Sequence, residues 1–208
     1  MFELDEDTAA VPIEPGRYAC VITDRWSIGA APNGGYLARI LLSGIERSVA
    51  HPDPFSMTTH FLATAKPGPA EVRVEVVRAG KGHSTAQASL VQDGRELCRA
   101  LAVMGDLGKL EGPTHVAARP PALPPVEACE RGRAGPATSI LSIADRLDVA
   151  MRPGSISWMP APDGTPRPRS NVAELVGWMR LKDGRPADAA SLVFFVDAMP
   201  PPVLNLDA

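Results

Sequence analysis

The chain has 208 residues, of which 45% are hydrophobic and 22% are charged, and its formal net charge is −3. This composition is typical of a globular protein, and the lack of a basic run argues against nucleic acid as a partner. No stretch approaches the roughly 18 consecutive apolar residues of a membrane-spanning helix, so we expect no membrane span.

The three cysteines, Cys20, Cys98 and Cys129, lie in none of the short paired spacings that hold metals or haem. Such unpaired thiols favour a reducing compartment, so we expect a cytoplasmic protein in which each thiol packs as a small side chain. The acidic start of the chain, residues 1–7, differs from the basic and then apolar start of a secretion signal. We predict no metal site and no cofactor.

Residues 17–28 combine β-branched and aromatic side chains, which predicts a strand. Asn33 is a favourable N-cap, because its side chain can accept hydrogen bonds from N–H groups one turn further on. Apolar residues at helical spacing then predict a helix over 34–50, which the following His-Pro pair ends. Gly44 lowers helix propensity by about 1 kcal/mol relative to Ala, which is tolerable where a sheet wraps closely round the helix.

Four strand-like segments follow this helix, marked by alternating side chains and bounded by turn signals. They lie at 55–62, 71–76, 83–91 and 97–105. The Asp93-Gly94 pair between the last two is a strong hairpin signal. One strand, one long helix and an antiparallel meander is the order of a hotdog domain, so we predict an α+β hotdog fold over 1–110.

A Pro- and Ala-rich segment at 111–140 is predicted to be a linker, because proline neither continues a helix nor donates to a sheet. The first pattern then restarts over 141–208. Strands are predicted at 147–151, 156–158 and 172–181, and an apolar helix at 188–199. This second unit has opening strands and a helix but no meander, so we predict a double hotdog whose second unit is incomplete.

Several segments in this order resemble the acyl-CoA thioesterase II (TesB-like) family, whose members are double hotdogs. The matching segments are Pro32–Leu37, Ser56–Leu62, Val76–Gly80, Ser84–Gly94 and Leu192–Pro200. The resemblance implies hydrolysis of an acyl-CoA thioester to a free acid and CoA, within fatty acid metabolism. It also implies that Asp197 is a catalytic aspartate, because it matches the family's Asp at the end of a short apolar run before prolines.

The family's other two catalytic residues, a Thr or Ser and a Gln, belong to later strands that this sequence does not reach. Three readings therefore stay open: a fragment, a chain completed by another chain, and an inactive protein. The apolar helix at 188–199 also predicts association into a homo-oligomer through the second unit, because a large exposed apolar surface seldom stays monomeric.

The chemistry of three candidate sites can be argued from the residues. A carboxylate at Asp197 among apolar neighbours is costly to bury, and such a position favours a role in positioning and deprotonating a water, although an Asp near a helix C-terminus that simply faces solvent is the alternative. The helix start at Asn33, Gly34 and Gly35 offers free N–H groups that could polarise a thioester carbonyl, although the same glycines also suit a plain strand-to-helix turn. We also include His60 and His83 as substrate-binding candidates, while a local hydrogen bond is the simpler role for each.

Two hypotheses from different classes remain. The first is an acyl-CoA thioesterase in which Asp197 activates a water, since no Gly-x-Ser-x-Gly nucleophile motif occurs in the chain. The second is a non-catalytic protein that binds acyl-CoA or an acyl carrier, which the missing strands favour. A hotdog dehydratase is a weaker third option, because residues 29–38 contain neither the His nor the carboxylate that it would use.

Overall fold

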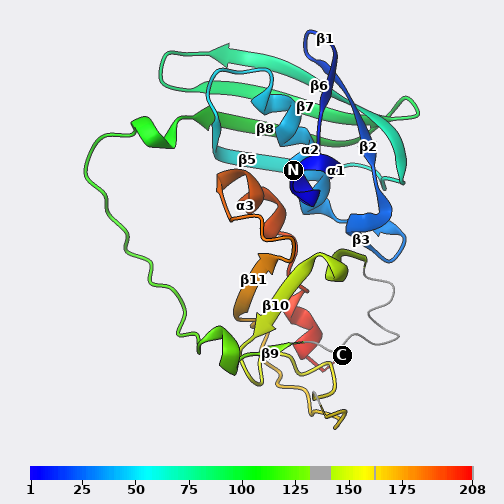
Figure 1. Cartoon of the computed structure of the whole chain (residues 1–208), viewed down its shortest axis with the longest axis vertical. Coiled ribbons are helices and arrows are strands. Elements are labelled where there is room, and N and C mark those ends of the chain that lie inside the picture. Colours follow the sequence, from blue (N-terminus) through cyan, green and yellow to red (C-terminus); the bar gives the residue numbers. More distant parts are fainter. Residues whose placement is uncertain (132–141, 162, 208) are drawn as a thin grey trace.

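The computed structural model describes residues 1–131, 142–161 and 163–207. Figure 1 shows two units joined by a long extended segment. In the first unit a six-stranded antiparallel sheet, ordered β1-β2-β6-β7-β8-β5, curves around helix α2 (Gly34–Glu46). Its strands are β1 (Val11–Glu14), β2 (Arg17–Ile22), β5 (Asp53–Phe61), β6 (Gly68–Ala79), β7 (Ser84–Gln92) and β8 (Arg95–Gly105). The short helix α1 (Glu3–Asp7) and strand β1 precede the predicted elements and were not anticipated from the sequence.

Helix α2 is the core of the first unit, since every residue from Gly35 to Ile45 is buried. The predicted cap is confirmed, because the Asn33 side chain accepts a hydrogen bond from the Tyr36 N–H at 3.0 Å. The predicted close approach at Gly44 is confirmed too, since a Cβ there would lie 2.6 Å from a Val72 methyl. The helix ends four residues earlier than predicted, where the chain turns just before Ser48.

The strand predicted over 17–28 is wrong in its second half. After β2 the chain forms a 3₁₀ turn (Asp24–Trp26) and then a small hairpin of β3 (Ser27–Ile28) and β4 (Ala31–Pro32). The physical reason is the burial of Trp26, which is fully enclosed between Tyr36 of α2 and Phe194 of the second unit. A straight strand would not carry this indole under the start of α2.

The second unit contains a three-stranded antiparallel sheet in the order β11-β10-β9, as far as the described residues go. Its elements are β9 (Glu130–Arg131), β10 (Leu147–Met151), β11 (Gly177–Leu181), helix α3 (Ala189–Phe195) and the short 3₁₀ segments 126–128, 142–145 and 202–205. Strand β9 falls within the range predicted as linker, of which residues 132–140 lie outside the described residues. The strand predicted at 156–158 is absent from the described structure, and only 177–181 of the predicted strand 172–181 forms one.

The buried side chain of Asn205 holds the irregular segment of this unit. It accepts from Ser157 and donates to the carbonyl oxygens of Ser155 and Glu174, at 2.8–3.1 Å.

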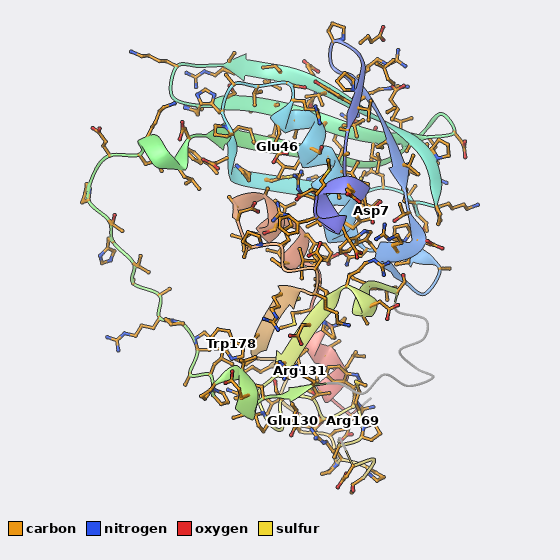
Figure 2. The ribbon with its side chains drawn as sticks, in the orientation of Figure 1. Asp7, Glu46, Glu130, Arg131, Arg169 and Trp178 are labelled. Carbon is orange, nitrogen blue, oxygen red and sulfur yellow. The ribbon has the colours of Figure 1, made fainter. Side chains whose placement is uncertain are left out.

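The extended linker is attached at its far end by Trp178, labelled in Figure 2, whose indole N–H donates to the Pro124 carbonyl at 3.0 Å. The domain boundaries predicted at residues 110 and 140 stay predictions.

Helix α3 packs on the first unit. Figure 1 shows it beside α2 and along β5, and its Phe194 is fully buried there. Part of the apolar surface of this helix, which was expected to be exposed and to drive association, therefore lies against the first unit's sheet edge, while Leu192 and Val196 stay exposed. In the part of the chain that the structure describes, no helix combines the length and the apolar character needed to cross a membrane.

An ion cluster on the outer face of the first sheet predicts acid sensitivity. Hydrogen bonds from Arg17 and Arg73 lower the pKa of Glu71 to about 2 from its ordinary 4.5. A carboxyl with a lowered pKa stabilises the fold above its ordinary value, and that contribution disappears as the pH falls towards 2. We expect Glu71→Gln to lower the melting temperature at pH 7, with the difference from wild type shrinking between pH 4.5 and pH 2. A difference that stays constant over this range would contradict the assignment.

Candidate functional site

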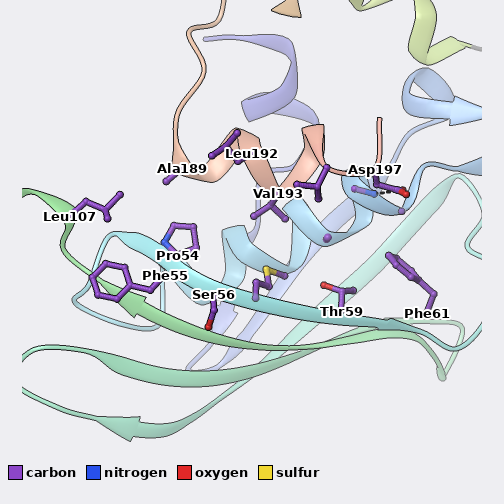
Figure 3. Close-up of a pocket in the computed structure, with 15 residues that line it drawn as sticks. Pro54, Phe55, Ser56, Thr59, Phe61, Leu107, Ala189, Leu192, Val193 and Asp197 are labelled. Atoms are coloured by element: carbon purple, nitrogen blue, oxygen red, sulfur yellow. Dashed lines mark hydrogen bonds between the residues drawn. The ribbon is translucent and has the colours of Figure 1, made fainter. Parts of the chain in front are cut away.

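A pocket of about 600 Å³ lies between α3, strand β5 and the start of α2 (Figure 3). Most of its lining is apolar, which suits a hydrocarbon chain better than a sugar or nucleotide. The lining residues are Gly34, Gly35, Ala38, Pro54, Phe55, Ser56, Met57, Thr59, Phe61, Leu107, Ala189, Leu192, Val193, Val196 and Asp197. The pocket therefore combines residues from both units, with one carboxylate at its edge.

The start of α2 forms the polar end of this pocket because two glycines let α3 come close. A Cβ on Gly35 would lie against the Phe194 carbonyl oxygen and 3.1 Å from the Phe194 Cα. A Cβ on Gly34 would lie 2.8 Å from both Asp197 Oδ2 and the ring of Phe61. Glycine is thus required here for the approach of backbone and carboxylate, in addition to any need for a turn.

Asp197 binds directly to this helix start. Its Oδ2 accepts hydrogen bonds from the Gly35 N–H at 2.9 Å and from Asn33 Nδ2 at 3.0 Å. The same Asn33 amide also donates to the Asp197 carbonyl oxygen at 2.9 Å. A carboxylate is favourable at the positive end of a helix, so the dipole of α2 compensates for the unfavourable place of Asp197 beyond the end of α3.

The expectation that Asp197 is buried among apolar residues is wrong. Asp197 is an exposed residue, and it lies one position beyond the α3 C-cap, Val196. The helix predicted to run to residue 199 ends at Phe195, so Asp197 lies beyond the helix and stays exposed while it contacts the start of α2. The feature that singles out Asp197 is its pair of bonds to the first unit.

The N–H groups proposed to polarise a carbonyl are partly engaged. The Gly35 N–H donates to Asp197, and the Tyr36 N–H donates to Asn33 Oδ1. Among the described residues, the Gly34 N–H donates to no protein acceptor, and Gly34 also lines the pocket.

Helix α2 is held in place by the Tyr36 hydroxyl, which donates to the Asp7 carbonyl at 3.0 Å. Burial raises the pKa of this phenol to about 12.

The structure does not bring the two predicted histidines to Asp197. His60 lies on β5 between Thr59 and Phe61, and since these two line the pocket, strand alternation places His60 on the opposite face. His83 lies in the turn between β6 and β7, where its Nε2 is 2.9 Å from a nitrogen of Arg78. The same turn contacts His51 just beyond the other end of α2, so His83 is about a helix length away from the site.

Six pocket residues on β5 were not proposed as site residues, namely Pro54, Phe55, Ser56, Met57, Thr59 and Phe61. Met57, Thr59 and Phe61 alternate along the strand, and Figure 3 shows Thr59 and Phe61 on the side of α3 and Asp197. The alternation was visible in the sequence, but it could not identify which face meets the second unit. Among the described residues, no group of three or more His, Cys, Asp or Glu side chains has the arrangement of a metal site.

These features define the class of protein: an α+β hotdog chain of two units, with a helix wrapped by an antiparallel sheet and an apolar pocket at the junction. The profile of the acyl-CoA thioesterase N-terminal domain matches residues 22–105. The profile of the C-terminal domain of the same family matches residues 117–208. Together they cover most of the chain, which therefore belongs to the acyl-CoA thioesterase family, as the sequence resemblance predicted.

Solved structures agree with this assignment. A protein from Thermobifida fusca YX, assigned as a thioesterase II, is 31% identical and superposes with a TM-score of 0.83 over 100% of this chain and 75% of that chain. A hotdog-fold protein from Alicyclobacillus acidocaldarius is 24% identical, with a TM-score of 0.82 over 98% and 72% of the two chains. An acyl-CoA thioesterase II from Mycobacterium marinum is 21% identical, with a TM-score of 0.65 over 93% and 68%. The last two establish the fold alone.

One curated relative covers less of the chain. The ustilagic acid biosynthesis cluster protein orf2 of Mycosarcoma maydis is 32% identical over 83 residues, which are 38% of this chain and 22% of that protein. The chain therefore spans only a small part of this relative.

Proposed function

We propose that the protein hydrolyses an acyl-CoA thioester to a free carboxylic acid and CoA, with Asp197 activating the attacking water. The observation that carries this proposal is the place of Asp197 at the polar end of an apolar pocket. Its Oδ2 is held by Asn33 and the Gly35 N–H, whereas its Oδ1 makes no hydrogen bond within the described residues. Membership of the acyl-CoA thioesterase family supports the substrate class.

The pocket is suited to the acyl group. Its volume of about 600 Å³ falls within the range usual for small-ligand sites, and side chains such as Met57, Leu192 and Val193 offer a hydrocarbon surface. An acyl chain lying between α3 and β5 would place its thioester carbon near Gly34 and Asp197. The larger CoA group would then extend from the open side of the pocket into solvent.

The proposed reaction needs no covalent intermediate with the protein. Oδ1 of Asp197 takes a proton from water while the water oxygen bonds to the thioester carbon. The carbonyl oxygen becomes an oxyanion, and the Gly34 N–H at the start of α2 is the donor that we propose for it. The carbon–sulfur bond then breaks, the proton passes to the leaving thiolate, and the carboxylate of Asp197 is restored.

A non-catalytic acyl-CoA or acyl-carrier binding protein is the second candidate. It is favoured by the bonds of Asp197 to Asn33 and Gly35, since such a bridge between two units would also serve a purely structural purpose. This alternative predicts the same pocket and the same affinity for acyl groups, but no release of thiol.

Thiol release from acyl-CoAs of increasing chain length is the experiment that tests the proposal. We expect release that is saturable and that depends on the length of the acyl group, because the chain must fit the pocket between α3 and β5. Binding should be followed in parallel by the displacement of a fluorescent fatty acyl probe. Saturable binding without thiol release would overturn the enzymatic proposal and support the binding protein.

We also propose that the protein is cytoplasmic, acts in fatty acid metabolism and associates through the second unit. The unpaired thiols of Cys20, Cys98 and Cys129 support a reducing compartment. The exposed apolar side chains of Leu192 on α3 and of Val196, the α3 C-cap, support association.

A further inference from the structure

Helix α1 joins the first unit through acidic side chains. The Asp7 carboxylate, labelled in Figure 2, accepts hydrogen bonds from the Trp26 indole N–H at 2.7 Å and from Arg25 at 3.1 Å. Glu3 pairs with Arg25 at 2.7 Å, and Leu4 on the other face is fully buried. The short helix is therefore attached firmly, although it lies before the region that the family profile matches.

The same helix contacts the second unit through Arg185. The Arg185 Nε is 2.9 and 3.0 Å from the two carboxylate oxygens of Asp5 on α1. The two terminal nitrogens donate to the two oxygens of Asp188 at 3.1 and 2.9 Å, and one of them also donates to the Pro186 carbonyl. Only 7% of the Arg185 side chain is exposed. A planar guanidinium suits such a two-sided arrangement, because its donors are fixed in one fork.

Arg185 thereby controls the start of α3. Asp188 is the N-cap of this helix, and its Oδ1 accepts the Ser191 N–H at 2.7 Å in a reciprocal capping box. Burial of Asp188 works against its charge, but bonds from Arg185 and Ser191 outweigh this effect and keep the pKa of the carboxyl below its ordinary value. The cap is thus a charged group anchored on both sides.

Helix α3 is only two turns long, so a contact that fixes the position of its N-terminal end also fixes the position of its C-terminal end. It runs from Ala189 to Phe195, and Asp197 follows after one further residue. Phe194 packs edge-on against Trp26, with the ring centres 5.2 Å apart. The path from Asp5 through Arg185 and Asp188 therefore connects α1 to the carboxylate that binds Gly35.

We propose that Arg185 is a positioning residue for Asp197: by tying the α3 N-cap to Asp5 of α1, it sets where α3 presents its carboxylate to the α2 start. The expected effect of Arg185 on turnover rests on the proposed function, whereas its expected effect on the position of α3 does not. A shift of α3 would lengthen the 2.9 Å bond from the Gly35 N–H to Asp197 and misplace the base by a distance that catalysis does not tolerate.

The test compares Arg185→Met and Arg185→Lys with a matched control, Arg167→Met. Arg167 is also a largely buried arginine of the second unit. It pairs with Glu130 at a distance of 2.7 Å, and this ion pair lies away from α3. The geometric readout is amide hydrogen exchange at Gly35, because that N–H is protected by Asp197. The kinetic readout is the separation of kcat from KM for acyl-CoA hydrolysis.

We expect Arg185→Met to speed exchange at Gly35 and to lower kcat about 10-fold or more with a smaller change in KM, since misplacement affects the reacting groups more than acyl binding. Arg185→Lys should change Gly35 exchange and kcat less than Arg185→Met does. Arg167→Met should leave both quantities at their wild-type values. Asp5→Asn, which leaves the α3 cap intact, should act in the same direction and serves if Arg185→Met fails to fold.

Unchanged Gly35 exchange and kcat in folded Arg185 and Asp5 variants would overturn the proposal. If the wild type releases no thiol, the proposed function fails, but Gly35 exchange still decides whether Arg185 positions Asp197.

Discussion

Asp197→Asn is expected to abolish most thioester hydrolysis while leaving the fold and acyl-CoA binding nearly unchanged. The amide oxygen of asparagine can still accept from the Gly35 N–H, so the contact between α3 and α2 survives in part. Asparagine cannot take a proton from water, and loss of a general base typically lowers turnover by about 10²–10⁴-fold. The measurement is kcat for thiol release, together with the melting temperature and the Kd for a fluorescent acyl probe.

Asp163→Asn is a suitable control for this variant. The Asp163 carboxylate also accepts a backbone N–H, from Thr165 at 2.9 Å, but it lies in an exposed turn of the second unit outside the pocket. It should keep wild-type turnover. If Asp197→Asn also kept wild-type turnover, Asp197 would be a structural bridge between the units and the catalytic role would be excluded.

Gly35→Ala is expected to separate α3 from α2. The new methyl group would press against the Phe194 backbone, and because Gly35 and Phe194 are both buried, the clash is relieved only when the two helices move apart. Overpacking of this kind costs about 1–3 kcal/mol of unfolding free energy. Because the same movement breaks the bond between Gly35 and Asp197, thiol release should fall as well. Denaturant titration and thiol release measure the two effects.

Gly82→Ala provides the comparison, because a Cβ at Gly82 in the turn between β6 and β7 would meet nothing within 4 Å. We expect its stability and turnover to match those of the wild type. A Gly35→Ala protein that is as stable and as active as Gly82→Ala would show that α3 does not need this close approach.

Local patterns predicted the first unit well. The Asn33 cap, the helical spacing after it and the alternation of β5 to β8 each reflect interactions between near neighbours in the chain, which do not depend on distant segments. The family resemblance was recognisable for the same reason, since its motifs mark a helix start and successive turns. The misplaced elements were those that a distant partner decides, such as the 3₁₀ turn that buries Trp26 against Phe194.

The candidate site was predicted only in part. Asp197 was proposed from its resemblance to a family aspartate, and Gly34 and Gly35 from the chemistry of a helix start. Their direct contact was not anticipated, because it joins residues 162 positions apart in the case of Gly35. The apolar burial assumed for Asp197 was wrong, and His60 was assigned without knowing which face of β5 meets α3.

The sequence by itself determined the hotdog class, the helix that a sheet would wrap and the family, because capping, side-chain periodicity and turn chemistry are local properties. Only the tertiary structure decided which helix start receives the Asp197 carboxylate, which face of β5 lines the pocket and how Arg185 links α1 to α3. These three features arise from packing the second unit on the first. The free energy of such contacts depends on groups that no short stretch of the chain contains.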